Sequence, residues 1–260
     1  MWEMLIINPM VNSMLFLYSL LFNNLTLTIV VFTLLIRALT FPLTWQQQKS
    51  TKALQDLQQS DEWKKTQAKY SAPADKDKLA QEQMKMYQQA GVNPFGSCLP
   101  LVIQFPIIIG MYQAITSSIA ATPLQLFTLS SHLYSFLPNV TNLIPLDNRF
   151  LWMNLGLPDP YYVMPLFVAA TTWVQSKVMT PAAADPQAGQ MSQTMALTST
   201  LMFGYFSLTF ASGLSIYFIF SNLMSIVQYS FTNPINWRNI FSLRGPAPAP
   251  AAAAKNRKSK

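Results

Sequence analysis

Arg37 is the residue of this sequence whose chemistry most needs an explanation. It lies 12 positions into the apolar segment 25–44 and is the only charged residue of that segment. About 20 consecutive apolar residues predict a helix that spans a membrane. At 1.5 Å per residue, Arg37 would lie roughly 18 Å deep in a hydrocarbon core about 30 Å thick.

Two explanations of Arg37 follow from this depth. Its long side chain could reach back to the membrane surface, which would need no function. However, all ten Asp and Glu residues lie outside the five predicted spans, so no carboxylate within a span can pair with the guanidinium. An unpaired arginine inside a membrane costs several kcal/mol unless water or polar groups surround it. We therefore favour a hydrated cavity around Arg37.

Polar residues in the other predicted spans support such a cavity. Most of them would lie in the same half of the membrane as Arg37. Taken singly, each could simply bond to a neighbouring helix, which is worth about 1 kcal/mol. Their shared depth instead predicts one polar groove that opens to the cytoplasm. The candidates for this groove are Arg37, Gln104, Gln175, Asn222 and Ser225, together with Ser199, Thr200 and Gln228.

The sequence offers little for other chemistry. The single cysteine, Cys98, excludes an intrachain disulfide and a zinc ribbon, and the single histidine, His132, excludes a His-rich metal site. The HExxH, GxSxG, P-loop and GxGxxG patterns do not occur. We expect Cys98 to be a packing residue and His132 to be structural. We also expect no enzyme activity, no metal and no cofactor.

Composition and charge distribution point to a membrane protein. Of the 260 residues, 51% are hydrophobic and 10% are charged, whereas about 25% are charged in a typical soluble domain. The net charge is +7, and 14 of the 17 Lys and Arg residues fall in 49–85 or 238–260. Clusters of this kind set the orientation of membrane spans and do not form a face for nucleic acid. The N-terminus lacks the features of a signal peptide, and we expect the chain to be used as written.

These patterns predict an all-α integral membrane protein with a core of five transmembrane helices. The charge-free run 193–232 is too long for one span, and we expect it to turn at 211–213, where Gly213 tolerates left-handed backbone angles. Residues 1–24 predict an amphipathic helix in the membrane interface, in preference to a further span. The predicted core spans are 25–45, 94–119, 161–180, 193–211 and 213–232.

Charge also places the connections between the spans. The Lys-rich segment 46–93 and the basic tail 233–260 should both be cytoplasmic, which an even number of spans between them satisfies. The N-terminus is then outside and the C-terminus inside, with a short cytoplasmic loop at 181–192. The apolar extracytoplasmic loop 120–160 would lie against the outer interface, with its aromatic residues in the interfacial belt, or fold as a cap over the helix ends.

Segment 46–93 is rich in helix-forming residues and predicts a cytoplasmic helical hairpin. A turn is expected at 71–75, with Asp75 as the N-cap of the second helix and Gly91 at its end. The hairpin is either a solvated connector or a mobile arm that docks a partner. The tail is either a solubilising extension or a contact for anionic lipid or ribosomal RNA.

The residues of the predicted groove also resemble a known family, the YidC/Oxa membrane protein insertases. The run YQQAGVNPFGSCLPLVIQFPIIIGMYQAI is similar to the family's GxNPxxxCLPxxxQxPxxxxLY region. The segment LIRALTFPLTWQQQKSTKALQDLQ resembles the family's first core helix, with the signature arginine at Arg37. LPDPYYVMPLFVAATTWVQSKVM and FASGLSIYFIFSNLMSIVQ resemble the third and the last core helix. The resemblance covers roughly residues 25–232.

This resemblance implies a five-helix core with a hydrophilic groove, closed to the outside and open to the cytoplasm and the lipid. It implies Arg37 as the central charge of the groove, with Gln104 and Gln175 at groove positions. Phe218 stands where many bacterial members have Trp, and it joins the expected groove residues; Ser212 stands where a Pro usually precedes the Gly. A lipoprotein signal and a large periplasmic domain are not expected.

The resemblance implies an insertase and chaperone of the bacterial plasma membrane, which moves polar tails of nascent membrane proteins through the groove and releases their helices into the bilayer. Nascent membrane proteins and the lipid bilayer are the expected partners, the Sec translocon and the ribosome are candidate partners, and DNA is not. The first alternative is a small-molecule or ion transporter, although the spans lack carboxylates for ion coupling. An intramembrane hydrolase and a purely structural assembly factor are further alternatives.

Overall fold

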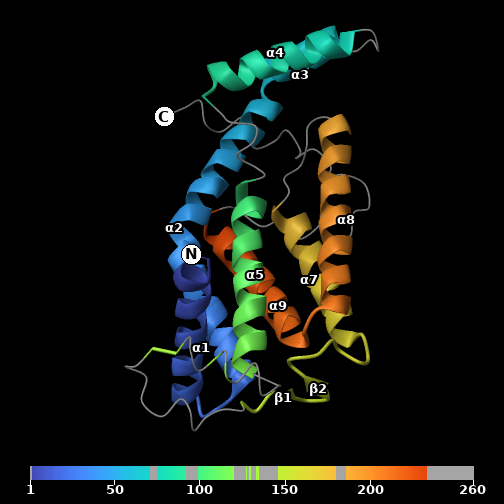
Figure 1. The fold of residues 1–260 in the computed structure, drawn as a ribbon. Helices are drawn as coiled ribbons and strands as arrows, with labels where there is room; N and C mark the ends of the chain where they lie inside the picture. Colours follow the sequence, from blue (N-terminus) through green and yellow to red (C-terminus); the bar gives the residue numbers. More distant parts are fainter. Residues whose placement is uncertain are drawn as a thin grey trace.

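The computed structural model describes residues 2–70, 75–91, 99–119, 127, 129, 133–134, 146–179 and 186–232, and most of these are helical. The helices run mainly along one long axis, with a helical hairpin across one end and a small β-hairpin at the other (Figure 1). The all-α membrane fold predicted from the sequence is confirmed. The elements are η1 (Glu3–Ile7), α1 (Asn8–Leu20), α2 (Leu25–Gln59), α3 (Asp61–Lys69), α4 (Lys76–Gln89), α5 (Leu99–Ile119), β1 (Arg149–Phe150), β2 (Met153–Asn154), α7 (Val163–Met179), α8 (Pro186–Thr209) and α9 (Ser212–Thr232).

The helix that carries Arg37 is much longer than predicted. We expected a span at 25–45 and a separate hairpin helix, but α2 continues unbroken for 35 residues, with Pro42 inside it. At 1.5 Å per residue it is about 52 Å long, well beyond a hydrocarbon core of about 30 Å. The break comes at Ser60, whose hydroxyl accepts a hydrogen bond from the Trp63 amide (3.2 Å) and so caps the next helix, α3.

The helices α3 and α4 form the predicted hairpin. Trp63 is buried between them, with its ring centroid 5.2 Å from that of Tyr87. Gly91 follows α4 with φ +64°, as expected of a helix-ending glycine. Asp75 occupies the predicted N-cap position but makes no cap hydrogen bond; its Oδ1 accepts from Lys78 Nζ (3.2 Å). The predicted turn residues 71–74 lie outside the described residues.

The N-terminal helical segment, η1 with α1, packs lengthwise against α2 and α5 (Figure 1). Val11, Met14 and Leu15 are at most 1% exposed, and a Cβ at Gly110 of α5 would lie only 2.7 Å from Met10 Sδ. Glu3–Leu20 is also long and apolar enough to cross a membrane. Close packing along two long helices favours the further span over the interfacial helix that the sequence analysis preferred. Its place relative to a bilayer stays a prediction.

The apolar core lies in the half of the bundle next to the β-hairpin. Its fully buried members come from α1, α2, α5, α7, α9 and the segment after β2, and include Ile29, Met111, Ile115, Leu155 and Leu214. Gly213 belongs to this core, and our reason for it was wrong. It does not have positive φ; a Cβ there would lie 3.1 Å from both Leu155 O and Ile115 Cγ2. This glycine is required for close approach and not for a left-handed turn.

The last three helices keep most of the predicted boundaries. α8 ends at Thr209 and α9 begins at Ser212, as expected for a turn at 211–213. However, α8 begins at Pro186, within the segment that we predicted as the loop 181–192, because a proline fits the first position of a helix and need not mark a loop. α7 packs against both α8 and α9. In the described part of the chain, Glu3–Leu20, Leu25–Gln59 and Ser212–Phe231 are long and apolar enough to span a membrane, and the count of five core spans stays a prediction.

The described end of loop 120–160 folds as a cap, the second of the two alternatives. The amide of Gly213 donates to Leu155 O (3.0 Å), and the Ser212 hydroxyl donates to Asn154 O (2.9 Å). Ser212, which departs from the family pattern, therefore links α9 to the cap. The amide of Asp147 donates to the Tyr18 hydroxyl (3.0 Å), which links the cap to α1. His132 and Cys98 lie outside the described residues.

Asp159 organises the junction between the cap and α7. Its buried carboxylate accepts hydrogen bonds from the Trp152 indole (2.9 Å) and from the amides of Tyr161 (3.2 Å) and Met164 (2.7 Å). Burial alone would raise the pKa of this carboxyl, but the hydrogen bonds outweigh burial and lower its pKa below the ordinary value. Trp152, Tyr161 and Tyr162 are exposed beside it, and their place in an interfacial belt stays a prediction.

Candidate functional site: a polar groove along α2

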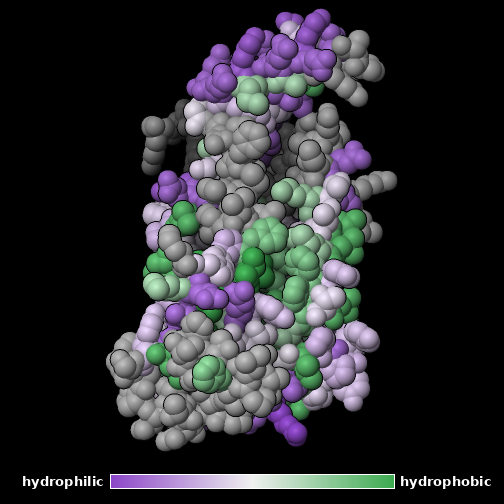
Figure 2. Space-filling model, viewed as in Figure 1, coloured by the Kyte–Doolittle hydropathy of each residue, from purple (hydrophilic) through white to green (hydrophobic). Residues whose placement is uncertain are grey.

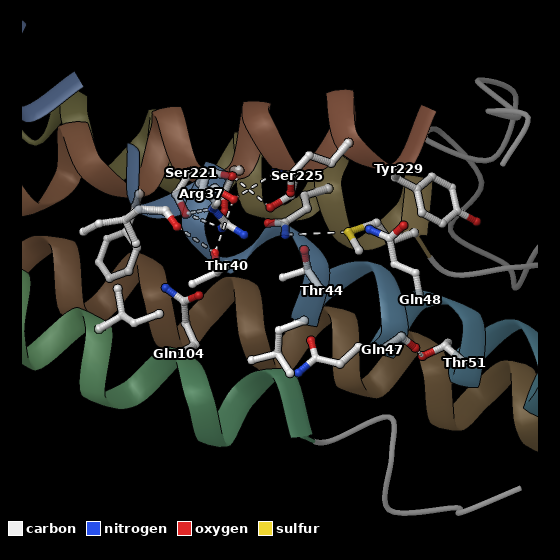
Figure 3. A pocket seen from close by; sticks show the side chains of 18 of the residues that line it. Arg37, Thr40, Thr44, Gln47, Gln48, Thr51, Gln104, Ser221, Ser225 and Tyr229 are labelled. Atoms are coloured by element: carbon white, nitrogen blue, oxygen red, sulfur yellow. Dashed lines mark hydrogen bonds between the residues drawn. The ribbon is translucent and has the colours of Figure 1, made fainter. Parts of the chain in front are cut away.

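A cavity of about 300 Å³ lies in the half of the bundle nearer to the α3–α4 hairpin. α2, α5, α7 and α9 supply most of its lining (Figure 3). At the hairpin end the lining includes the exposed Lys52, so the cavity opens to the surface there, and we call it the groove. It brings together most of the residues that the sequence analysis proposed for the groove: Arg37, Gln104, Gln175, Phe218, Asn222, Ser225 and Gln228.

Arg37 lies at the deep end of the groove. Its Nε donates to the Ser221 hydroxyl (3.0 Å), and its Nη2 contacts the same hydroxyl. The Gln228 amide donates to the backbone carbonyl of Arg37 (3.4 Å). Within the described residues, no carboxylate lies within 4.0 Å of the guanidinium, since the ion pairs found there are confined to α3, α4 and Asp75. The hydrated cavity preferred from the sequence fits this geometry better than a side chain that reaches to the membrane surface.

Aromatic rings close the groove behind Arg37. Tyr217 is 1% exposed, and its hydroxyl accepts a hydrogen bond from Gln104 Nε2 (2.8 Å). The Phe218 ring packs on Tyr217 (centroids 5.6 Å apart) and on Phe203 of α8 (5.1 Å). Beyond these rings lies the apolar core. The groove is therefore open at the hairpin end and sealed towards the β-hairpin.

Three further predicted residues have partners on their own or adjacent helices. Asn222 Nδ2 donates to the hydroxyls of Thr171 (3.2 Å) and Thr172 (2.9 Å), which ties α9 to α7. The Ser225 hydroxyl donates to Ser221 O (2.8 Å). Gln175 Nε2 has only a weak contact with Met179 Sδ (3.7 Å). Asn222 is thus a structural link at the groove wall, while Gln175 keeps most of its amide for other partners.

Ser199 and Thr200 do not line the groove, contrary to our expectation. Both hydroxyls donate to the carbonyl of Ala196 one turn earlier in α8, at 3.0 and 2.8 Å. Depth in a predicted span therefore did not separate residues that face the groove from residues that bond within their own helix.

Sequence reasoning missed a polar stripe on α2. From Arg37 onward, polar residues recur at intervals of three and four, which places them within an arc of about 100° on one face of the helix. The stripe is about 21 Å long at 1.5 Å per residue. The spacing was visible in the sequence, but ending the span at 45 divided it between two predicted elements. The stripe consists of Arg37, Thr40, Thr44, Gln47, Gln48 and Thr51, all of which line the groove.

The outer surface of the same molecule is divided by polarity. Hydrophilic side chains gather over α3 and α4, and hydrophobic ones are frequent over the helical body (Figure 2). Exposed apolar side chains on the last helices include Leu166, Phe167, Leu201, Leu223 and Val227. Within the described residues, no group of three or more His, Cys, Asp or Glu could hold a metal ion.

Comparisons with known proteins identify the family. The family model described as 60Kd inner membrane protein matches residues 16–238. The chain belongs to the YidC/Oxa family. It is 33% identical over 229 residues to the membrane protein insertase MisCA of Bacillus subtilis, covering 87% of this chain and 77% of that protein. It is 35% identical over 231 residues to the membrane protein insertase YidC 2 of Bacillus anthracis, covering 87% and 79%.

A solved structure of a relative confirms the fold of this YidC/Oxa chain. A crystal structure of an active YidC insertase with its first transmembrane domain resolved matches with a TM-score of 0.62 at 20% identity. The match covers 90% of this chain and 47% of that one, so the chain spans about half the length of the solved protein. The chain is thus a multi-pass membrane protein with the fold of that structure.

Proposed function

We propose that this chain is a membrane protein insertase. The observation that carries the proposal is Arg37: a guanidinium at the deep end of a polar groove, with no carboxylate partner among the residues that the structure describes. A site of this kind attracts a negatively charged, polar segment and reduces the free energy of removing that segment from water. The names of its relatives in two Bacillus species point to the same function.

In the proposed mechanism, a short polar tail of a nascent membrane protein enters the groove from the hairpin end. Arg37 binds an acidic side chain of this tail by exchanging the Ser221 hydroxyl for a carboxylate, which makes a stronger hydrogen bond. The apolar helix of the same substrate meets the exposed apolar side chains of α7 and α9. Its transfer into lipid, at a few tenths of a kcal/mol per residue over about 20 residues, drives the step. No covalent bond is made or broken.

The orientation follows from charge. The Lys-rich α3 and α4 belong in the cytoplasm under the positive-inside rule, and the groove then opens to the cytoplasm. The basic segment 238–260 belongs on the same side. The two basic parts would be the contacts for a ribosome, and an exposed apolar flank is available for a Sec translocon. If Glu3–Leu20 crosses the bilayer, the N-terminus is cytoplasmic as well.

The test is insertion by the purified chain in proteoliposomes. The substrates are single-span proteins whose short polar tails carry either two Asp or two Asn residues. Arg37→Ala should reduce insertion of the Asp substrate by about 10- to 100-fold, the value of one or two charge-assisted hydrogen bonds, and Arg37→Lys should largely preserve it. Equal insertion by the parent and both variants would refute the role of the charge. Uptake of ions or small solutes by the same vesicles, without insertion, would favour the transporter.

A further inference from the structure

Gln47 is the groove residue whose hydrogen bonding is incomplete. It is only 7% exposed, and its amide Nε2 has no hydrogen-bond partner among the residues that the structure describes. It lines the same cavity as Arg37 and extends from the polar face of α2 (Figure 3). A buried amide nitrogen without a partner is rare in native proteins, and each instance calls for a physical reason.

The fold itself gives no reason for an amide at this position. The neighbouring hydroxyls of the stripe close their hydrogen bonds inside α2: Thr51 donates to Gln47 O (3.0 Å) and Thr40 donates to Ile36 O (2.9 Å). A methionine would fill the same volume without an unmet donor. The terminal torsion of a glutamine is soft, so a rotation of the Gln47 amide can present its NH₂ to the cavity.

We propose that Gln47 donates a hydrogen bond to a backbone carbonyl of the substrate's polar segment, as a second contact point beside Arg37. This inference rests on the insertase function proposed above. A polar tail that passes through the membrane in an extended conformation carries carbonyl groups that have no partner within the segment. A donor held ready in the groove supplies one such partner, and it does so whatever the side chains of the tail are.

The two contact points define a register. Gln47 follows Arg37 by ten positions in one helix, which separates them by about 15 Å along the axis of α2. An extended chain advances about 3.3 Å per residue. A substrate whose acidic side chain is bound at Arg37 would therefore place the backbone four or five residues away beside Gln47. Arg37 would bind a negatively charged side chain of the tail, and Gln47 would bind a backbone carbonyl at a fixed number of residues from it.

The first experiment compares Gln47→Met with Gln46→Met in the proteoliposome assay. Gln46 is the adjacent residue of the same type, but it is exposed and does not line the groove. Gln47→Met should reduce insertion of the Asp-tailed and the Asn-tailed substrate to the same extent, about 2- to 10-fold, the range for one neutral hydrogen bond. Gln46→Met should have no effect. Gln47→Lys, which keeps a donor, should retain more activity than Gln47→Met.

Thermal unfolding in detergent without substrate separates this role from a structural one. Gln47→Met removes an unpaired buried donor, so its Tm should equal or exceed that of the parent while its insertion falls. A lower Tm than the parent would show that the amide is bonded within the fold and would overturn the inference. A loss restricted to the Asp substrate would also overturn it, because a backbone contact does not depend on tail charge.

The register is tested with a photo-crosslinking residue at position 47 and a stalled substrate that carries one Asp. The crosslinks should peak four or five residues from the Asp, and moving the Asp by two positions should move the peak by two. A peak that stays in place refutes the register. If the parent protein inserts no substrate, the proposed function fails; if it inserts normally and Gln47→Met behaves like Gln46→Met, this inference fails alone.

Discussion

The two ends of α2 lie in opposite surroundings. From Leu25 to Thr33 the helix is part of the apolar core, and its buried threonines, Thr28 and Thr33, donate back to carbonyls one turn earlier (2.8 and 2.6 Å). From Arg37 to Thr51 the same helix lines the groove, where, among the described residues, the Arg37 guanidinium bonds only to Ser221 and Gln47 Nε2 has no hydrogen-bond partner. One continuous helix therefore joins a segment that is fully packed to a segment in which some hydrogen-bond donors have no full set of partners.

This difference shows how one bundle can be stable and still receive a polar segment. The packed half, with the cap at its β-hairpin end, holds α1, α2, α5 and α9 together. The groove half can then keep donors unpaired and volume unfilled, since its stability is supplied elsewhere in the same helices. Changes in the packed half should reduce stability without regard to the substrate. Changes in the groove half should alter insertion at nearly constant stability.

The largest effect on stability is expected for Ile115→Ala. Ile115 of α5 is fully buried in the apolar core and contacts the close-packed Gly213. Removing its side chain leaves a cavity and should lower the free energy of unfolding by about 2–4 kcal/mol. Thermal unfolding in detergent measures this loss. Insertion per folded molecule should stay the same for Asp- and Asn-tailed substrates. A loss that depends on tail charge would contradict the conclusion that the packed half contributes to stability and not to substrate binding.

Gly213→Val should have the next largest effect. A Cβ at this position would lie 3.1 Å from the carbonyl oxygen of Leu155, which is backbone and cannot turn away. Overpacking of this kind costs about 1–3 kcal/mol. Gly204→Val is the matched control, because the nearest atom to its Cβ is Ala169 Cβ at an ordinary 3.6 Å. Equal Tm values for the two variants would mean that the cap does not fix the start of α9.

Asp159 links stability to pH at the β-hairpin end of the packed half. Its folded pKa lies below the ordinary value of 3.8 because the hydrogen bonds to its carboxylate outweigh burial. The stabilisation is therefore complete above about pH 4 and is lost as the pH falls through the folded pKa. Asp159→Asn should cost about 1–2 kcal/mol at neutral pH and should remove this part of the acid sensitivity. Parallel acid-unfolding curves for the parent and the variant would contradict this assignment.

The sequence predicts those parts of the packed half and the groove half that depend on neighbouring residues, and not those that depend on residues distant in the chain. The lone charge of Arg37 and the amide side chains of Gln104, Gln175 and Asn222 stand out against apolar surroundings, so these groove residues could be predicted, whereas the same depth argument wrongly included Ser199 and Thr200. The length of α2 could not, because the cue for its end, the capping Ser60, lies beyond the point where the polar composition suggested a new element. The role of Gly213 depends on Leu155, which is distant in sequence.

The smallest expected effects come from a pair of matched threonines. Thr33 lies in the packed half and is fully buried, whereas Thr44 lines the groove, and each donates its hydroxyl to a carbonyl of its own helix (2.6 and 2.9 Å). Replacing either by Val keeps the shape but removes one hydrogen bond within the helix, and it should lower the free energy of unfolding by about 1 kcal/mol or less.

The two threonine variants should differ in their insertion activity. Thr44→Val removes a hydroxyl that can solvate a polar tail and should lower insertion about 2-fold, near the lower limit for one hydrogen bond. Thr33→Val should insert substrates like the parent. The assay is the same proteoliposome reaction, normalised to folded protein. Equal activity of the two variants would mean that the α2 hydroxyls do not contact the tail, and the proposed contacts would then reduce to Arg37 and Gln47.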